Sequence, residues 1–288
     1  MPEPKPSRFP VMEHMTVKQV RAYLARKQSI LIPMGVTEQH GYHLPLSTDA
    51  TIATELGRRI GGLADVLVAP TMYESFSGGG LPGTVNISPA VMSLVVSDRL
   101  VSLAAQGFRH FYLWLCHGGS ENERALEDAL RILLRTNPTF QESLIALLPV
   151  WRFGRRCADG WGRAIREHDW HAGWLETSLM LALAPELVRM DELETDPEPL
   201  LSLQIEHPDN YQHAEKMVDD PVVIPRLTQR PDIQVGVMGH PEQADRELGE
   251  RATEAIVAEV ADKIQDLEAR ADGVYEEVEF TPEPIVLE

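Results

Sequence analysis

The residues best suited to chemistry gather between Gly35 and Asp49, in the stretch GVTEQHGYHLPLSTD. This stretch contains two carboxylates, Glu38 and Asp49, and two imidazoles, His40 and His43. Divalent metals of hard or borderline character favour this mixture of oxygen and nitrogen ligands. Glycines and a proline in the same stretch allow sharp, rigid turns. The stretch therefore predicts one wall of a metal-hydrolase site.

Each of these residues also has an ordinary structural explanation. On an extended loop, Glu38 and His40 would point the same way and could reach one pair of metals, but polar residues of a surface loop have the same spacing. Asp49 opens a helical pattern and could simply cap that helix, because a helix N-terminus favours a carboxylate. A bridging aspartate could do both.

A second candidate, His117, follows the apolar run 110–115 and precedes two glycines. An exposed histidine beside a flexible turn is commonplace, so His117 is informative only together with the first stretch. The neighbouring Cys116 is expected to be a small hydrophobe on a buried strand, and a cysteine nucleophile is the less favoured alternative.

The third candidate stretch runs from His168 to Ser178, with the sequence HDWHAGWLETS. Glu176 falls in the first turn of a predicted helix, where it could bind a metal or only complement the helix dipole. His171 lies just before this helix, and histidine is the usual proton carrier near neutral pH.

Four apolar runs, at 29–34, 66–69, 110–115 and 144–149, predict the buried strands that must position these residues. Helical patterns separate them, at 17–26, 49–60, 89–106 and 120–135, with capping boxes predicted at Thr16/Gln19 and at Ser120/Glu123. The alternation predicts an α/β protein, a three-layer α/β/α sandwich with a largely parallel sheet. Sites in such sheets lie beyond the carboxyl ends of the strands, where the Glu38 loop and His117 would meet.

The remaining segments are less regular. We expect an irregular, proline-rich arm at 1–13, a long loop at 151–172 and a helix at 174–183. Residues 195–240 predict mostly loop with one or two strands. A final helix would begin at Pro241 and end near Ala271, followed by an acidic tail at 273–288.

Composition narrows the function classes. The 288 residues carry a net charge of −18, which argues against nucleic acids and anionic membranes as partners. The acidic run 191–196 is expected to be solvated surface. Two cysteines, Cys116 and Cys157, form no disulfide framework, and a reducing cytoplasm is the simplest location. The sequence shows no signal core and no apolar run near the ~18 residues of a membrane span.

Four patterns together resemble the creatininase (creatinine amidohydrolase) family. They are T-E-Q-H-G-x-H-L-P-L-x-T-D at 37–49, S-G-G-G-x-P-G-T at 77–84, H-G-G at 117–119 and H-A-G-x-x-E-T-S at 171–178. They occur in the family's order. The resemblance implies a creatininase-like fold, with a single hydrolase domain over residues 1–272.

The resemblance also implies a site for two divalent metal ions, Zn, Mn or Fe, at the carboxyl edge of the sheet. By motif position the ligands would be Glu38, His40, Asp49 and His117, with Asp49 bridging. In creatininase a carboxylate lies two residues after the strand-end histidine, but that position here is Gly119. In the branch of the family that carries H-G-G, the glutamate of H-A-G-x-x-E looks like the replacement, so the resemblance implies Glu176 as the remaining ligand, with Glu121 as the fallback.

The same resemblance suggests roles for residues around the metals. His171 matches the family's proposed acid/base histidine, and His43 would support the ligands without binding metal. Trp151 would pack against the substrate. Further substrate contacts are expected from Ser77, Gly78, Gly79 and Trp170.

The implied reaction is attack of a hydroxide, held between two metals, on a carbonyl carbon of a small cyclic substrate. Cleavage of an amide C–N bond is the favoured outcome. The alternatives are a ring-opening C–C hydrolase of a cyclic diketone, similar to 3-dehydro-scyllo-inosose hydrolase, and a catalytically inactive metal-binding or interaction protein. The resemblance also implies a homo-oligomer, a hexamer in many members.

Overall fold

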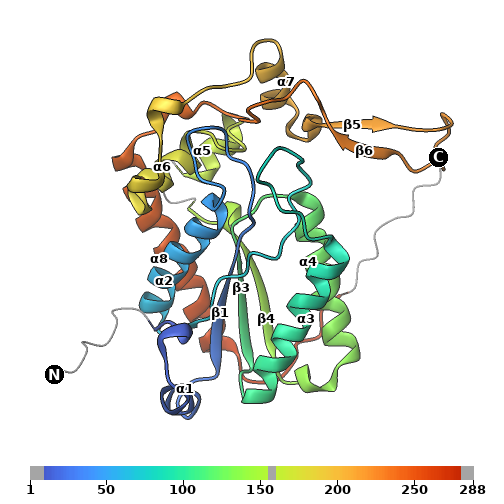
Figure 1. Ribbon diagram of the computed structural model, residues 1–288. Coiled ribbons are helices and arrows are strands. Elements are labelled where there is room, and N and C mark those ends of the chain that lie inside the picture. The colour runs from blue at the N-terminus through green and yellow to red at the C-terminus, as the bar shows by residue number, and fades with distance from the viewer. Residues whose placement is uncertain (1–9, 155–159, 280–288) are drawn as a thin grey trace.

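A sheet of four parallel strands forms the centre of the computed structural model, which describes residues 10–154 and 160–279 (Figure 1). The strands are β1 (Ser29–Met34), β2 (Leu67–Val68), β3 (His110–Leu115) and β4 (Leu144–Pro149), in the order β2-β1-β3-β4. Every residue of β1 is buried, because helices cover both faces of the sheet. Ser29 pairs with His110 and Met34 with Leu115, so β1 and β3 end at the same edge.

Helices form a layer on each face, which confirms the predicted α/β/α sandwich. One layer contains α2 (Thr48–Ala64), α5 (Trp161–Arg166), α6 (Trp174–Leu183) and α8 (Arg246–Arg270). The other contains α1 (Val17–Leu24), α3 (Pro89–Gln106) and α4 (Ser120–Thr136). Successive strand residues point to opposite layers, so Leu31 belongs to the first core and Ile30 to the second.

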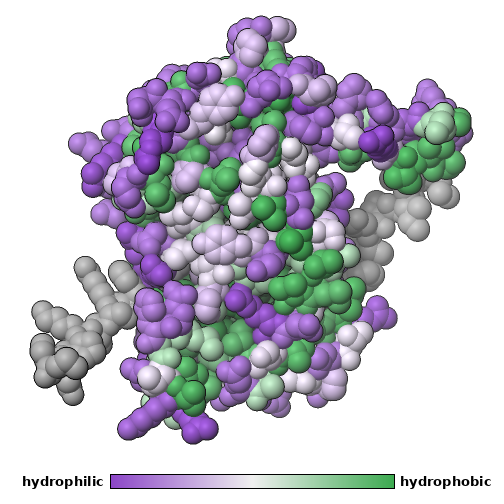
Figure 2. All heavy atoms as spheres, viewed as in Figure 1, coloured by the Kyte–Doolittle hydropathy of each residue, from purple (hydrophilic) through white to green (hydrophobic). Residues whose placement is uncertain are grey.

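Residues 184–240 pass over the carboxyl edge of the sheet (Figure 1). They include α7 (Leu200–Glu206) and an antiparallel ribbon of β5 (Gln212–Glu215) and β6 (Arg226–Gln229), which confirms the one or two strands predicted there. The ribbon projects sideways from the body of the protein, and Figure 2 shows hydrophobic atoms gathered at its end.

Three local predictions need correction. Pro241 opens a 3-10 turn, and α8 begins only after Asp245, whose side chain accepts a hydrogen bond from Leu248 N. Helix α4 has Gly119 and not Ser120 at its N-cap, so no side chain caps it, and Glu123 lies 3.0 Å from Arg152. The loop predicted at 151–172 contains α5. The capping box of Thr16 and Gln19 is confirmed.

The 3-10 turns of the described chain lie at Met12–His14, Pro138–Phe140, Val150–Arg152, Pro185–Leu187, Met190–Glu192, Pro208–Tyr211 and Pro241–Gln243. Most of the arm predicted at 1–13, Cys157, and residues 280–288 of the tail lie outside the described residues. Residues 273–279 of the tail contain no helix or strand. No helix in the described ranges is long and apolar enough to cross a membrane.

Candidate metal centre

Four elements bring the predicted ligands to the carboxyl edge of the sheet. Glu38 and His40 lie on the loop after β1, Asp49 in the first turn of α2, His117 just after β3, and Glu176 in the first turn of α6. Gly35 allows this assembly, because a Cβ there would lie 2.5 Å from the backbone nitrogen of Ala50 on α2. All five ligand candidates are at most 9% exposed, which is unusual for charged side chains.

Asp49 lies between two groups of potential ligands. Its Oδ1 is 3.2 Å from His40 Nε2, and its Oδ2 is 3.0 Å from His117 Nδ1. Glu38 Oε2 lies 3.3 Å from His117 Nδ1, and Glu176 Oε2 lies 3.8 Å from His40 Nε2. The ligand atoms of Glu38, Asp49 and His117 all fall within 4.8 Å of one another, and so do those of His40, Asp49 and Glu176.

The donor set fits divalent cations. Three carboxylates and two imidazoles meet in a buried space, and buried charges persist in proteins when they are paired or bind metals. The Oε2 atom of Glu38 is buried and has no hydrogen-bond partner. An acceptor left in this state is suited to a cation.

The carboxyl groups at the centre differ in acidity. Burial alone would raise the pKa of Glu38, but His171 and His117 nearby lower it to about 2. Burial raises the pKa of Glu176 to about 7, although His40 opposes this shift. Burial would lower the pKa of His40, but Asp49 and the glutamates beside it raise it to about 9. Such opposed shifts in one buried cluster are typical of functional sites.

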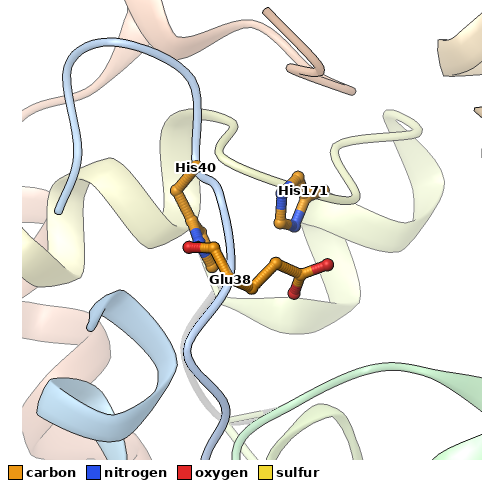
Figure 3. A group of neighbouring side chains, drawn as sticks. All are labelled: Glu38, His40 and His171. Atoms are coloured by element: carbon orange, nitrogen blue, oxygen red, sulfur yellow. The ribbon is translucent and has the colours of Figure 1, made fainter. Parts of the chain in front are cut away.

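His171 lies within reach of the same cluster. Its Nε2 is 2.8 Å from the carbonyl oxygen of Gln39, and its ring lies 4.3 Å from that of His40. Burial and His40 lower the pKa of His171 to about 4. The ligand atoms of Glu38, His40 and His171 form a third group within 4.8 Å, and Figure 3 shows these three side chains converging. The structure therefore places His171 close enough for either proton transfer or ligation.

Two other predicted residues stand apart from the ligand atoms. His43 is fully buried, its Nε2 lies 2.9 Å from Thr177 Oγ1, and among the described residues it joins none of the three groups. It stands next to the helical turn that carries Glu176, which suits the supporting role predicted for it. Glu121 is exposed and also joins no group, although it lines the cavity described next.

A cavity of about 680 Å³ opens beside the cluster. Ser77, Gly79 and Trp170, three of the residues predicted to contact the substrate, line it. Ser77 Oγ also donates a 2.5 Å hydrogen bond to Glu38 Oε1. Gly78 and Trp151 are not among its lining residues, and Trp151 packs instead against both hydrophobic cores.

Two buried aspartates that hold the site were missed by the sequence patterns. The carboxylate of Asp169 accepts hydrogen bonds from the backbone of Trp174, Leu175 and His240, at 2.9–3.1 Å, and so fixes the start of α6. Glycine follows at position 173, where a Cβ would lie 1.8 Å from Asp169 Oδ1. The spacing of Asp169 and Gly173 in the HDWHAG stretch is the sequence feature that could have predicted this contact.

Asp196 is the second missed residue, and the prediction that the run 191–196 is solvated surface is wrong there. Asp196 is 2% exposed, and its carboxylate accepts hydrogen bonds from the backbone of residues 234–236 at 2.7–3.1 Å. These contacts order the segment that leads back from the ribbon to His171. An acidic run gives no local sign of which carboxylate turns inward.

Comparison with known proteins agrees with this architecture. A family model for creatininase (creatinine amidohydrolase) matches residues 13–264. Creatinine amidohydrolase of Pseudomonas putida is 28% identical over 272 residues, covering 88% of this chain and 95% of the relative. The mycofactocin precursor peptide peptidase of Mycolicibacterium smegmatis is 28% identical over 257 residues, covering 85% and 87%.

A more partial match is the 3-dehydro-scyllo-inosose hydrolase of Thermotoga maritima, 28% identical over 201 residues and covering 65% of this chain and 60% of that protein. Among solved structures, creatininase with Mn is 26% identical with a TM-score of 0.69, covering 90% of this chain and 98% of the other. A creatininase mutant of Zn–Zn type has a TM-score of 0.70 at 26% identity, covering 89% and 97%. The chain thus belongs to the creatininase family of metal-dependent hydrolases.

Proposed function

We propose that this protein is a binuclear metal-dependent amidohydrolase that cleaves a C–N bond in a small, cyclic substrate. The observation that carries the proposal is the position of Asp49, whose two oxygens face two separate ligand groups. Glu38, Asp49 and His117 would hold one ion, and His40, Asp49 and Glu176 the other. Two ions per chain, Zn, Mn or Fe, suit these ligands.

Divalent ions held by these residues would supply an activated water and would polarise a carbonyl group. The protein's own residues bind and orient the reactants and exclude bulk water, because the cluster is almost fully buried. Nε2 of His171 lies 2.8 Å from Gln39 O and 3.0 Å from Gln39 Nε2, so Gln39 positions the ring, and the imidazole accepts a proton and passes it to the leaving nitrogen. Burial keeps this imidazole neutral and able to accept it.

The decisive experiment combines metal analysis with product analysis. We expect about two equivalents of divalent metal per chain after gentle purification, and conversion of cyclic amides to a ring-opened product that carries a new carboxylate and a new amine. Absence of metal, with no uptake of Zn²⁺, Mn²⁺ or Fe²⁺, would contradict the site itself. Metal uptake without turnover of any cyclic amide or diketone would favour the inactive metal-binding alternative.

Ring-opening C–C hydrolysis is the second candidate, since the 3-dehydro-scyllo-inosose hydrolase of Thermotoga maritima is similar in sequence to 65% of this chain. It predicts that a nitrogen-free cyclic diketone opens to an acid while cyclic amides stay intact. For the cellular setting we propose a homo-oligomer, a hexamer by the family resemblance, in the cytoplasm, where the buried thiol of Cys116 would stay reduced.

A further inference from the structure

The turn of the β5–β6 ribbon exposes a group of apolar side chains. Met217, Val218, Val222 and Ile224 are 96%, 59%, 84% and 86% exposed, and we call them the ribbon tip. Figure 2 shows this hydrophobic end standing clear of the body of the protein. Clustered apolar side chains at the end of a projecting element mark an interaction surface.

The ribbon receives little support at its end. The turn is held by local hydrogen bonds, from Lys216 Nζ to Asp220 O at 2.8 Å and from Val222 N to Asp220 Oδ1 at 2.9 Å. A two-stranded ribbon on its own is marginally stable in water. A binding partner would stabilise the ribbon. A second copy of the chain is always available as such a partner, because it is made together with the first.

A surface suited to receive the ribbon tip lies on the same chain. Val91 and Leu94 on α3 are 48% and 66% exposed and three residues apart, so they are neighbours on one helix face, which we call the α3 patch. Figure 2 shows hydrophobic atoms over this region, below the ribbon. Each copy therefore offers one apolar projection and one apolar receiving face.

Charge agrees with a second copy as the partner. The chain carries −18 overall, but the acids of the ribbon, Glu215, Asp219 and Asp220, are nearly balanced by Lys216 and Arg226. The ribbon can therefore approach another acidic copy without strong repulsion, and it offers no acidic patch to select a basic protein.

We propose that the ribbon tip docks on the α3 patch of a second copy of this chain. Such a contact joins two different surfaces, so copies of the chain can assemble through it into a ring when the rotation between neighbours closes.

Docking would also support the metal centre, because the base of the ribbon forms part of the cavity wall. Gln212 and Gln229 line the cavity. Gln229 Oε1 accepts a 2.9 Å hydrogen bond from Gly80 N, in the glycine-rich loop that also contains Ser77. Ser77 in turn contacts Glu38. The partner copy would thus fix the ribbon, and through it the loop against Glu38.

The first test charges the tip with the double variant Met217→Asp/Ile224→Asp. We expect a lower molar mass by light scattering after size exclusion, a kcat/KM several-fold lower, and unchanged metal content. The control, Val17→Asp/Leu63→Asp, adds the same charge at exposed apolar positions on α1 and α2 and should keep the wild-type mass. A monomeric wild type, or a tip variant of wild-type mass, would overturn the proposal.

The second test identifies the receiving surface. Single variants Met217→Cys and Leu94→Cys are mixed and oxidised, and we expect a covalent dimer from the mixture but from neither variant alone. Loss of mass in the first test without this cross-link would overturn docking on the α3 patch. The mass and cross-linking readouts are independent of the proposed hydrolysis, and only the kcat/KM readout rests on it.

Discussion

Two clusters of carboxylate and histidine lie at opposite ends of the sheet. At the amino edge, Glu268 of α8 accepts hydrogen bonds from Ser29 Oγ at 2.7 Å and Tyr112 OH at 2.5 Å, and lies 2.9 Å from His110 Nδ1. At the carboxyl edge, Asp49 lies among His40, His117 and two glutamates. The same residue types therefore build both ends of the fold.

The clusters differ in the balance of donors and acceptors. At the amino edge three donors surround one carboxylate. Burial would raise the pKa of Glu268, but these hydrogen bonds lower it to about 2. At the carboxyl edge three carboxylates share two imidazoles, and Glu38 Oε2 has no hydrogen-bond partner. A buried cluster whose hydrogen-bond donors match its acceptors stabilises the folded protein. A buried cluster with more acceptors than donors is suited to binding cations.

The largest effect is expected from Asp49→Ala, which removes the carboxylate shared by both ligand groups. Metal content should fall by at least one ion per chain, and kcat/KM by more than the ~100-fold that follows loss of a supporting residue near a metal. The metal-free variant should melt below the metal-free wild type, because Asp49 pairs with the imidazoles of His40 and His117 and its loss leaves them buried without that partner. Metal analysis, kinetics and calorimetry measure these outcomes, and full metal retention would refute the bridging role.

The next effect separates the two candidates for the last ligand. Glu176→Ala should remove one ion and most activity, because Glu176 Oε2 lies 3.8 Å from His40 Nε2 within a ligand group. Glu121→Ala is the matched control and should keep both ions, because Glu121 is exposed and outside the groups. If metal analysis shows that Glu121→Ala loses an ion and Glu176→Ala keeps both, Glu121 is the ligand and Glu176 is not.

A third prediction concerns His171, which lies near the ligands but is assigned proton transfer. His171→Ala should lower kcat by about 10²–10⁴-fold, the usual contribution of a general acid or base, with metal content near that of the wild type. Loss of an ion in this variant would show that His171 is a ligand, as its group with Glu38 and His40 also permits.

Sequence patterns predicted those parts of the structure that depend on local interactions or on hydrophobic residues repeated along the chain. The strands at 29–34 and 110–115 are continuous apolar runs because both sheet faces are covered, so their burial is visible in the sequence. The site followed from the rule that such strands end at one edge, which brought His117 to Asp49.

Long-range contacts set the features that the sequence patterns missed. Asp196 turns inward because it meets the backbone of residues 234–236, some 40 positions away. The predicted capping box of Ser120 and Glu123 is absent because α4 begins at Ser120 itself, with Gly119 at the N-cap. The cluster around Glu268 joins three distant segments and matches no motif, so its balance of donors and acceptors is visible only in three dimensions.

The smallest expected effect tests the amino-edge cluster. Glu268→Gln keeps the side-chain shape but replaces charge-assisted hydrogen bonds with neutral ones, so the free energy of unfolding should fall by about 1–2 kcal/mol at pH 7. Metal content should be unchanged, which distinguishes this edge from the other. Chemical denaturation followed by circular dichroism measures the loss.

The pH dependence of that loss identifies its cause. The folded pKa of Glu268 is about 2, below its ordinary value of 4.5. The charged form therefore contributes its full stability above pH 4.5, and this contribution declines as pH falls toward 2. Since the amide introduced by Glu268→Gln does not titrate, the stability gap between wild type and variant should narrow between pH 5 and pH 3. A gap that stays constant over this range would show that shape, and not charge, makes Glu268 important.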